Sequence, residues 1–307
     1  MSTKFTLTNA SSSPSPASGE QRGVWLLVAG GILLGTLGVF VQEADQNPLV
    51  TVWFRCAFGA LALFLWSAST GRLKELQLRG RPLGMAWVTG CLMLLNWGLF
   101  FAAIPRTSMA VATVVFHIQP IWVLVFGALF LREPVSKGQW LATPAALCGL
   151  ALTTGLLDDL AFARHTGNEY ILGLLMCLGG SLSYAAVTLL AKAEPGIRPL
   201  SMAFWQCAVG SVVLAWAPLT FGWPQQASAW AWLAGLGVIH TGLAYVILFA
   251  GMARLSLGRI AVLQFVYPLA AVLLDWGIYG TPMSLVQVIG MALMGTAVWA
   301  IRKPGQA

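Results

Sequence analysis

Apolar residues fill the chain in long runs, and short polar segments separate these runs at nearly regular intervals. Most runs hold about twenty residues, the length at which an α-helix crosses the roughly 30 Å hydrocarbon layer of a bilayer. They cover residues 23–42, 50–69, 83–104, 108–131, 137–156, 171–191, 200–220, 228–250, 256–280 and 283–301. The pattern predicts ten transmembrane helices, five in each half of the chain, and therefore an all-α membrane protein.

The second half of the chain repeats the first. At an offset of 148 positions, Arg106, Ser108, Val114, Pro120, Pro134, Ser136 and Gln139 coincide with Arg254, Ser256, Val262, Pro268, Pro282, Ser284 and Gln287. At an offset of 151, Pro48, Cys56 and Gly59 coincide with Pro199, Cys207 and Gly210. Because each copy has an odd number of crossings, the second copy must be inverted relative to the first. This plan, with repeats at 23–156 and 171–302, is typical of secondary transporters, whose substrate site lies near the bilayer midplane between the repeats.

Composition excludes a soluble globular domain. Only 9% of residues are charged and 58% are hydrophobic, with a mean hydropathy of +0.79, whereas soluble domains carry roughly 25% charged residues. All five cysteines lie within apolar runs, where they act as small hydrophobic residues. Residues 1–22 are rich in serine, threonine and proline, and we predict that they form a disordered tail.

Positive charges predict the orientation of the helices. Of the 17 lysines and arginines, 14 lie on the side of the amino terminus, Arg106 and Arg164 lie on the other side, and Arg55 lies within a run. Lysine and arginine concentrate on the cytoplasmic side of membrane proteins. We therefore expect a multi-pass protein of the bacterial inner membrane with both termini in the cytoplasm. The same placement explains the net charge of +7 without a nucleic-acid partner.

Polar side chains precede a proline in the middle of two equivalent runs. His117 and Gln119 come before Pro120, and Gln264 and Tyr267 come before Pro268. Each proline removes an amide donor and leaves a carbonyl one turn earlier without its helical partner. Our hypothesis is that these side chains line a substrate cavity where the two copies meet. The alternative is that they satisfy the freed carbonyls or bond between helices.

Aromatic residues in other runs extend this hypothetical cavity. Trp97 and Tyr245 are equivalent at the offset of 148, so both copies place a ring at one level. We expect Trp97, Phe101, Tyr184 and Tyr245 to form its walls, and Asn96 to assist His117, Gln119, Gln264 and Tyr267 in orienting the polar groups of a substrate. No carboxylate lies at the midplane of a run, so His117 is the first candidate if transport is coupled to protons.

Two charged residues lie more than a helical turn inside their runs. Arg55 and Asp275 are at similar depths, and either charge alone in hydrocarbon is costly. They form an ion pair with each other, or each finds a separate partner. We assign them, together with Glu133 and the two prolines Pro120 and Pro268, a structural or gating role.

Signals of an enzyme, a metal site or a cofactor are missing from the sequence. It has no glycine-rich phosphate loop, no histidine pair four residues apart and no nucleophile elbow. A membrane-embedded enzyme would have to use Asp158, Asp159 and His165 in one external loop. A structural or receptor subunit without solute flux is the other alternative. We predict that the protein is not an enzyme.

Two stretches resemble a known family of transporters. They are PLVTVWFRCAFGALAL at Pro48–Leu63 and PIWVLVFGALFLREPVSKGQWLATPAALCGLAL at Pro120–Leu152. Both are similar to the EamA branch of the drug/metabolite transporter superfamily, which commonly has an arginine at the position of Arg55 and a glutamate at that of Glu133. The second copy departs from this pattern, since Thr281 replaces the glutamate. The resemblance implies a fold of ten helices in two inverted five-helix repeats.

A narrower resemblance suggests the substrate. The stretch GTLGVFVQEA and the aromatic-rich runs are similar to YddG-type exporters of aromatic amino acids. Our hypothesis is export of amino acids, aromatic or large neutral ones, by alternating access through a central cavity. The alternative is another small metabolite, such as a nucleoside, a small polar amino acid or a drug-like compound. The expected partners are the substrate and the lipid bilayer, with the protein a monomer or weak homodimer.

Overall fold

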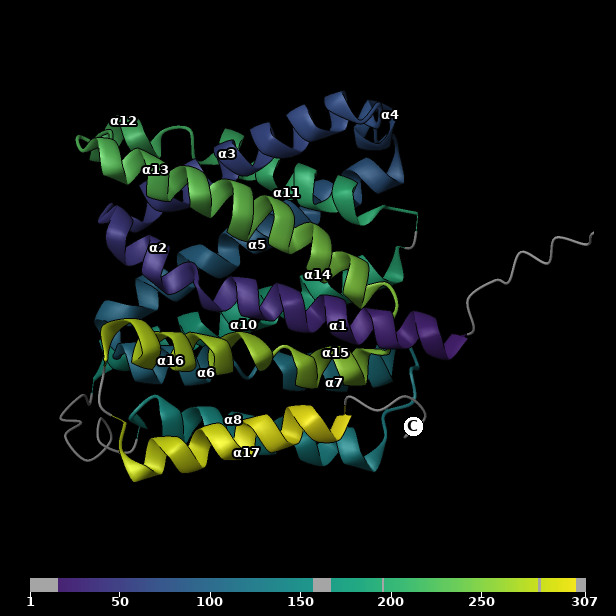
Figure 1. Cartoon of the computed structure of the whole chain (residues 1–307), viewed down its shortest axis with the longest axis vertical. Helices are drawn as coiled ribbons and strands as arrows, with labels where there is room; N and C mark the ends of the chain where they lie inside the picture. The colour runs from purple at the N-terminus through teal and green to yellow at the C-terminus, as the bar shows by residue number, and fades with distance from the viewer. Residues whose placement is uncertain (1–15, 157–166, 195, 281–282, 302–307) are drawn as a thin grey trace, which may run out of the picture.

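The computed structural model describes residues 16–156, 167–194, 196–280 and 283–301, and these form helices joined by short turns (Figure 1). Within them, seven helical segments are long and apolar enough to span a membrane: Ser18–Ala44, Pro48–Ser69, Arg81–Arg106, Met109–Phe130, Asn168–Ala193, Ala227–Met252 and Leu257–Tyr279. Shorter helices at Lys137–Thr153, Pro199–Val213 and Leu285–Ile301 occupy the other three predicted runs. The predicted all-α membrane fold is confirmed, and each predicted run contains helix.

The helices of the two halves follow one another in matching order. The first half contains α1 (Pro16–Gly35), α2 (Leu37–Ala44), α3 (Pro48–Ser69), α4 (Leu73–Leu76), α5 (Arg81–Ala103), η1 (Ile104–Arg106), α6 (Met109–Phe116), α7 (Gln119–Phe130) and α8 (Lys137–Thr153). The second contains α10 (Asn168–Ala193), α11 (Pro199–Val213), α12 (Ala217–Phe221), α13 (Ala227–Gly235), η2 (Leu236–Leu243), α14 (Ala244–Met252), α15 (Leu257–Leu263), α16 (Val266–Tyr279) and α17 (Leu285–Ile301).

The first helix begins earlier than the sequence predicted. Helix α1 starts at Pro16, so residues 16–22 of the expected disordered tail are helical. Proline suits the first position of a helix because its missing amide would have no helical partner there. Residues 1–15 lie outside the described part of the chain.

Both proline-containing spans are broken just before the proline. Helix α6 ends at Phe116 and α7 begins at Gln119, while α15 ends at Leu263 and α16 begins at Val266. In the first break Ile118 N donates to Val115 O at 3.2 Å, a turn tighter than the α-helix. Pro120 has no amide to offer the carbonyl of Phe116, so the regular ladder cannot continue. The breaks place polar side chains at mid-span.

The two halves run in opposite senses through the molecule. In Figure 1, α6 and α16 lie on the left and α7 and α15 on the right, so equivalent broken spans are antiparallel. Helix packing is also equivalent in the two halves. Helix α1 contacts α14 and α16 of the second half, and its equivalent α10 contacts α5, α6 and α7 of the first half. The predicted inverted repeat is therefore confirmed.

Local contacts recur in both copies. Ser136 and Gln139 form a reciprocal capping box at the start of α8, and Ser284 and Gln287 exchange the same two hydrogen bonds before α17. Where α3 crosses α11, Gly59 lies against Cys207 and the equivalent Gly210 lies against Cys56. A side chain at either glycine would meet that sulfur, so glycine allows the two helices to approach closely at the pseudo-twofold axis.

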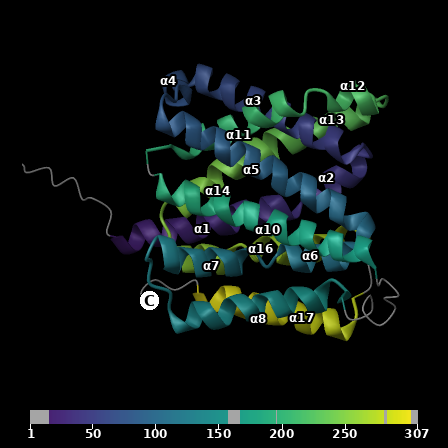
Figure 2. The same cartoon turned by 180° about the vertical axis from the view of Figure 1, so that it is seen from behind.

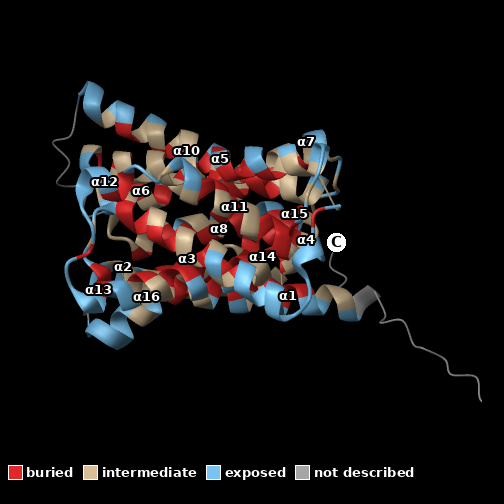
Figure 3. Ribbon diagram, turned by 90° about the horizontal axis from the view of Figure 1, so that it is seen from above, coloured by how far each residue is buried: buried red, intermediate tan, exposed pale blue. Residues whose placement is uncertain are grey.

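The outside of the bundle is apolar. Phe130, Leu141 and Leu285 are each more than 70% exposed, as expected of side chains that face lipid. Seen from above, buried residues concentrate where helices face one another (Figure 3). Helices α8 and α17 pack on each other at the edge of the bundle in both lateral views (Figure 2), so the other spans surround the centre.

Candidate functional site

A cavity of about 280 Å³ lies at the centre of the molecule, and both halves contribute to its wall. It is lined by residues of α1, α2, α3, α5, α6, α7, α10, α14, α15 and α16. All nine residues of the predicted substrate site lie on this wall: Asn96, Trp97, Phe101, His117, Gln119, Tyr184, Tyr245, Gln264 and Tyr267. The sequence hypothesis therefore selected residues that the fold brings together.

The break between α6 and α7 fixes the imidazole of His117. Its Nδ1 lies 2.7 Å from the carbonyl oxygen of Thr113. A carbonyl only accepts hydrogen bonds, so Nδ1 carries the hydrogen and Nε2 of the neutral ring is an acceptor. The ring also stacks on Tyr267, with 6.1 Å between centroids and 28° between planes. His117 is thereby held with one acceptor nitrogen available at the cavity.

Amide side chains link the two halves around the cavity. Gln119 Nε2 donates to Gln264 Oε1 across the two helix breaks. Asn96 Nδ2 donates to the carbonyl of Gly180 at 2.9 Å and so joins α5 to α10. Gln264 Nε2 is buried and has no hydrogen-bond partner among the described residues. Bonding between helices, the alternative considered for these residues, is thus present, while one amide donor stays unused.

Aromatic rings form much of the wall. The equivalent residues Trp97 and Tyr245 face each other, with ring centroids 6.5 Å apart. Phe100 packs against Phe116 at 4.8 Å. These rings give the cavity broad apolar surfaces that suit the side chain of a small organic molecule.

Arg55, to which the sequence analysis assigned a structural or gating role, lies on the wall of the central cavity. It is 5% exposed, its Nε donates to Thr241 Oγ1 at 3.0 Å, and its guanidinium carbon lies 4.5 Å from the ring centroid of Trp97. The alternative of an ion pair with Asp275 is wrong, since no such pair is present among the described residues. Asp275 is exposed and lines a separate cavity with Tyr279 and Gln287.

The central cavity opens at one end of the bundle. Met109 lines it and is 59% exposed, whereas its repeat equivalent Leu257 is 0% exposed. At the end of Leu257, the lining residue Met252 is also buried. Access is therefore from the end where η1 turns into α6, and the opposite end is closed.

A polar contact between the halves occupies the closed end. The carboxylate of Glu133, after α7, accepts the backbone N–H of Leu257 at 2.8 Å and lies 3.9 Å from Lys192 Nζ. Lys192 also donates to the carbonyl of Leu255 at 2.6 Å. A carboxylate at the start of α15 is stabilised by the unpaired amides and dipole of that helix. Glu133 thus connects the first half to the second through this hydrogen bond and ion pair.

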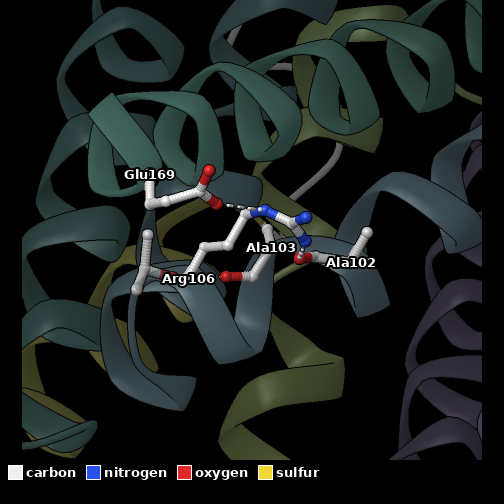
Figure 4. A network of polar contacts seen from close by, with 5 residues as sticks. Ala102, Ala103, Arg106 and Glu169 are labelled. Carbon is white, nitrogen blue, oxygen red and sulfur yellow. Dashed lines mark hydrogen bonds and ion pairs between the residues drawn. The ribbon is translucent and has the colours of Figure 1, made fainter. Parts of the chain in front are cut away.

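Ion pairs between the halves are distributed unevenly. At the open end Arg106 Nε donates to Glu169 Oε2 at 3.0 Å, and Arg106 Nη1 donates to the carbonyl of Ala102 at 2.7 Å (Figure 4). The other ion pairs among the described residues also join the two halves, and all lie toward the closed end: Arg81–Glu194, Lys192–Glu133, Arg198–Glu75 and Arg259–Glu20.

Sequence reasoning missed some of the lining residues. Leu248 is equivalent to Phe100 at the offset of 148, and Thr113 lies one turn before His117, so both could have been found from the repeat and the helical period. Within the described ranges, no group of three or more histidine, cysteine or acidic residues is arranged to hold a metal ion. Asp158, Asp159 and His165, named for the enzyme alternative, lie outside those ranges.

Two inverted copies of an apolar helical bundle around a central cavity define a multi-pass membrane transporter. The chain belongs to the EamA-like transporter family, which matches residues 21–155 and 171–302. The resemblance to this family is thereby confirmed, and it is a family of transporters.

Named relatives and a solved structure agree with this membership. The chain is 27% identical to the uncharacterized transporter YxxF of Bacillus subtilis, over 90% of this chain and 88% of that protein. It is 26% identical to the pseudopaline exporter CntI of Pseudomonas aeruginosa, over 80% and 83% of the two chains. One solved crystal structure superimposes with a TM-score of 0.78 at 18% identity, covering 91% of this chain and 96% of that chain, and so has the same fold.

Proposed function

We propose that this protein exports amino acids, aromatic or large neutral ones, by alternating access through the central cavity. The observation that carries the proposal is the cavity itself, about 280 Å³ in volume, with aromatic walls and a few polar groups. Small-molecule sites occupy about 300–1,000 Å³, so the volume suits one small metabolite. Tyr184 and the facing rings of Trp97 and Tyr245 suit an apolar or aromatic side chain.

Polar groups of the cavity match the backbone of an amino acid. The Nε2 acceptor of His117 suits an ammonium group. In this proposal His117, Gln119, Gln264, Tyr267 and Asn96 orient the substrate. Pro120 and Pro268 supply the breaks at which the spans bend.

Orientation in the membrane follows from charge. The start of α1 and the end of α17 lie at the same end of the bundle (Figure 1), and lysine and arginine concentrate at that end. We propose that this end faces the cytoplasm across the bacterial inner membrane. The open cavity then faces outward, in the state that follows release of an exported substrate. The name of the pseudopaline exporter supports export by this protein too.

The same relative favours a second candidate, which is export of a metabolite other than a standard amino acid. Counterflow into proteoliposomes separates the two. The purified protein is reconstituted into liposomes that are preloaded with unlabelled solute. Uptake of labelled phenylalanine, tryptophan, leucine, alanine and uridine is then measured. We expect flux of the aromatic and large neutral amino acids above protein-free liposomes. Flux of uridine alone favours the second candidate, and the absence of amino-acid flux rejects the first.

A further inference from the structure

We propose that Arg55 binds the carboxylate of the substrate, so that the cavity selects molecules bearing an anionic group. This inference rests on the proposed function and deepens it, because it assigns one side chain to one chemical group of the cargo. It also changes the role of Arg55 from support of the fold to recognition.

The first argument is that Arg55 has no acidic counter-ion among the described residues. Two arginines are buried among the described residues, Arg55 and Arg259, each 5% exposed. Arg259 forms an ion pair with Glu20. Arg55 instead has a neutral hydroxyl at 3.0 Å and an indole ring at 4.5 Å, and the ion pairs of the described chain do not include it. A buried charge without a counter-ion is costly, and a bound anion would remove that cost.

The second argument is the geometry of the guanidinium. Thr241 receives the Nε hydrogen, and the indole of Trp97 covers one face of the group. Among the described residues, the hydrogen bonds of the guanidinium involve Nε and neither terminal amino group, and Arg55 lines the cavity. Two parallel N–H donors on one edge are the arrangement that binds a carboxylate bidentately. Thr241 and Trp97 thus hold the edge in place for a ligand.

The third argument comes from the repeat. In the register that pairs Cys56 with Cys207, the residue equivalent to Arg55 is Gln206. Gln206 is buried on α11 and does not line the cavity. Because the crossing of α3 and α11 is built from equivalent residues on both sides, it accepts a neutral side chain at this position. The positive charge of Arg55 is therefore a feature of the cavity and not of the crossing.

The fourth argument is the charge of the wall. No acidic side chain lines the central cavity within the described ranges, while Arg55 brings a full positive charge. In a site with largely apolar walls, this charge favours anions and zwitterions and disfavours cations that lack a carboxylate. Amino acids fit this requirement, and neutral nucleosides and amine drugs do not use it.

Counterflow with matched substrates tests the inference. L-phenylalanine and L-phenylalaninamide differ at the carboxylate, and the variants are Arg55→Gln, Arg55→Lys and, as a charge-loss control, the exposed Arg79→Gln. Losing a charge-assisted pair should raise the half-saturation concentration for phenylalanine about tenfold to a hundredfold in Arg55→Gln. We expect a smaller increase in Arg55→Lys, little change for phenylalaninamide, and wild-type behaviour in Arg79→Gln. An unchanged preference for acid over amide in Arg55→Gln overturns the inference.

A second measurement does not require transport or a mutant. Phenylglyoxal modifies arginine, and mass spectrometry of the wild-type protein reports its rate at Arg55. Phenylpropionate should slow this modification, whereas neutral phenylpropanamide should not. Equal rates with both compounds overturn the inference even if no amino acid is carried. Flux of phenylalanine with normal kinetics in Arg55→Gln would reject the role of Arg55 while leaving the proposed function intact.

Discussion

At the scale of single residues, the cavity combines apolar rings with a small number of fixed polar atoms. Trp97 serves twice, since its ring faces Tyr245 and also covers the guanidinium of Arg55. A ring in this place supplies apolar contact area and a cation–π contact worth about 0.5–2 kcal/mol. Loss of Trp97 should therefore weaken substrate binding by two routes.

The corresponding prediction concerns Trp97→Ala. We expect the half-saturation concentration in counterflow to rise about tenfold or more. The variant loses both an aromatic wall of the cavity and the ring that contacts the guanidinium of Arg55. The control is Trp140→Ala, since Trp140 is exposed on the outside of the bundle and does not line the cavity. Equal kinetics in both variants, at equal amounts of folded protein, would place the substrate elsewhere.

Much of the site could be predicted from the sequence, and its failures have physical causes. The polar residues beside the paired prolines and the aromatic rings at equivalent positions indicate the cavity. Burying a polar group in hydrocarbon without a partner is energetically costly, so such groups lie at cavities or at contacts between helices. Depth along a helix does not give the direction of a side chain. The similar depths of Arg55 and Asp275 therefore suggested an ion pair, whereas in the structure the Arg55 side chain contacts Thr241 and Trp97.

At the scale of elements, the broken spans position the polar groups. Helices α6 and α7 meet at His117 and Ile118, and α15 and α16 meet at Gln264 and Phe265. The sequence predicted these breaks because proline cannot continue the hydrogen-bond ladder. It did not predict the interruption of the first span at Thr36 or the π-helical turn η2, which no proline marks. The hydroxyl of Thr36 lies 2.6 Å from Nε2 of His240 in η2, so tertiary contact accompanies both irregularities.

Replacing the proline of a broken span should impair transport without unfolding the protein. Pro120→Ala restores a backbone amide that can donate to the carbonyl of Phe116. Proline inside a helix costs about 3 kcal/mol, so the variant should form a straighter and more stable span. We expect equal or higher thermal stability and slower counterflow, since His117 would leave its position. Pro144→Ala is the matched control, because Pro144 lies inside α8 and away from the cavity. Wild-type flux in Pro120→Ala would show that the break is dispensable.

The contact at the closed end gives a second prediction at this scale. Glu133→Ala removes the acceptor for Leu257 N–H and the partner of Lys192. A hydrogen bond to a charged group contributes about 1.5–3 kcal/mol, although partial exposure lowers the share of the ion pair. We expect amide exchange at the start of α15 to become about tenfold faster by mass spectrometry. Glu169→Ala, at the open end, should leave that segment unchanged, and the reverse pattern would contradict the assignment of the closed end.

At the scale of the whole molecule, the inverted repeat makes two end states possible from one set of contacts. Several helix pairs between the halves have an equivalent pair, as α1 with α14 and α10 with α5. The two ends are nevertheless unequal, since four of the five ion pairs within the described residues lie toward the closed end. The end with more ion pairs is the end of the buried Leu257, and the end with one is the end of the exposed Met109.

Blocking the mouth of the cavity tests the central claim, that this cavity is the path of the substrate, most directly. A single cysteine replaces Met109 in a background where the exposed Cys91 and Cys148 are changed to alanine. A bulky, membrane-impermeant maleimide is then added from outside. The control is Asn168→Cys, because Asn168 is exposed at the start of α10, beside Glu169 at the open end, and does not line the cavity. We predict that complete labelling of Met109→Cys abolishes phenylalanine counterflow and that complete labelling of Asn168→Cys does not. Full counterflow through a completely labelled Met109→Cys protein would contradict the account.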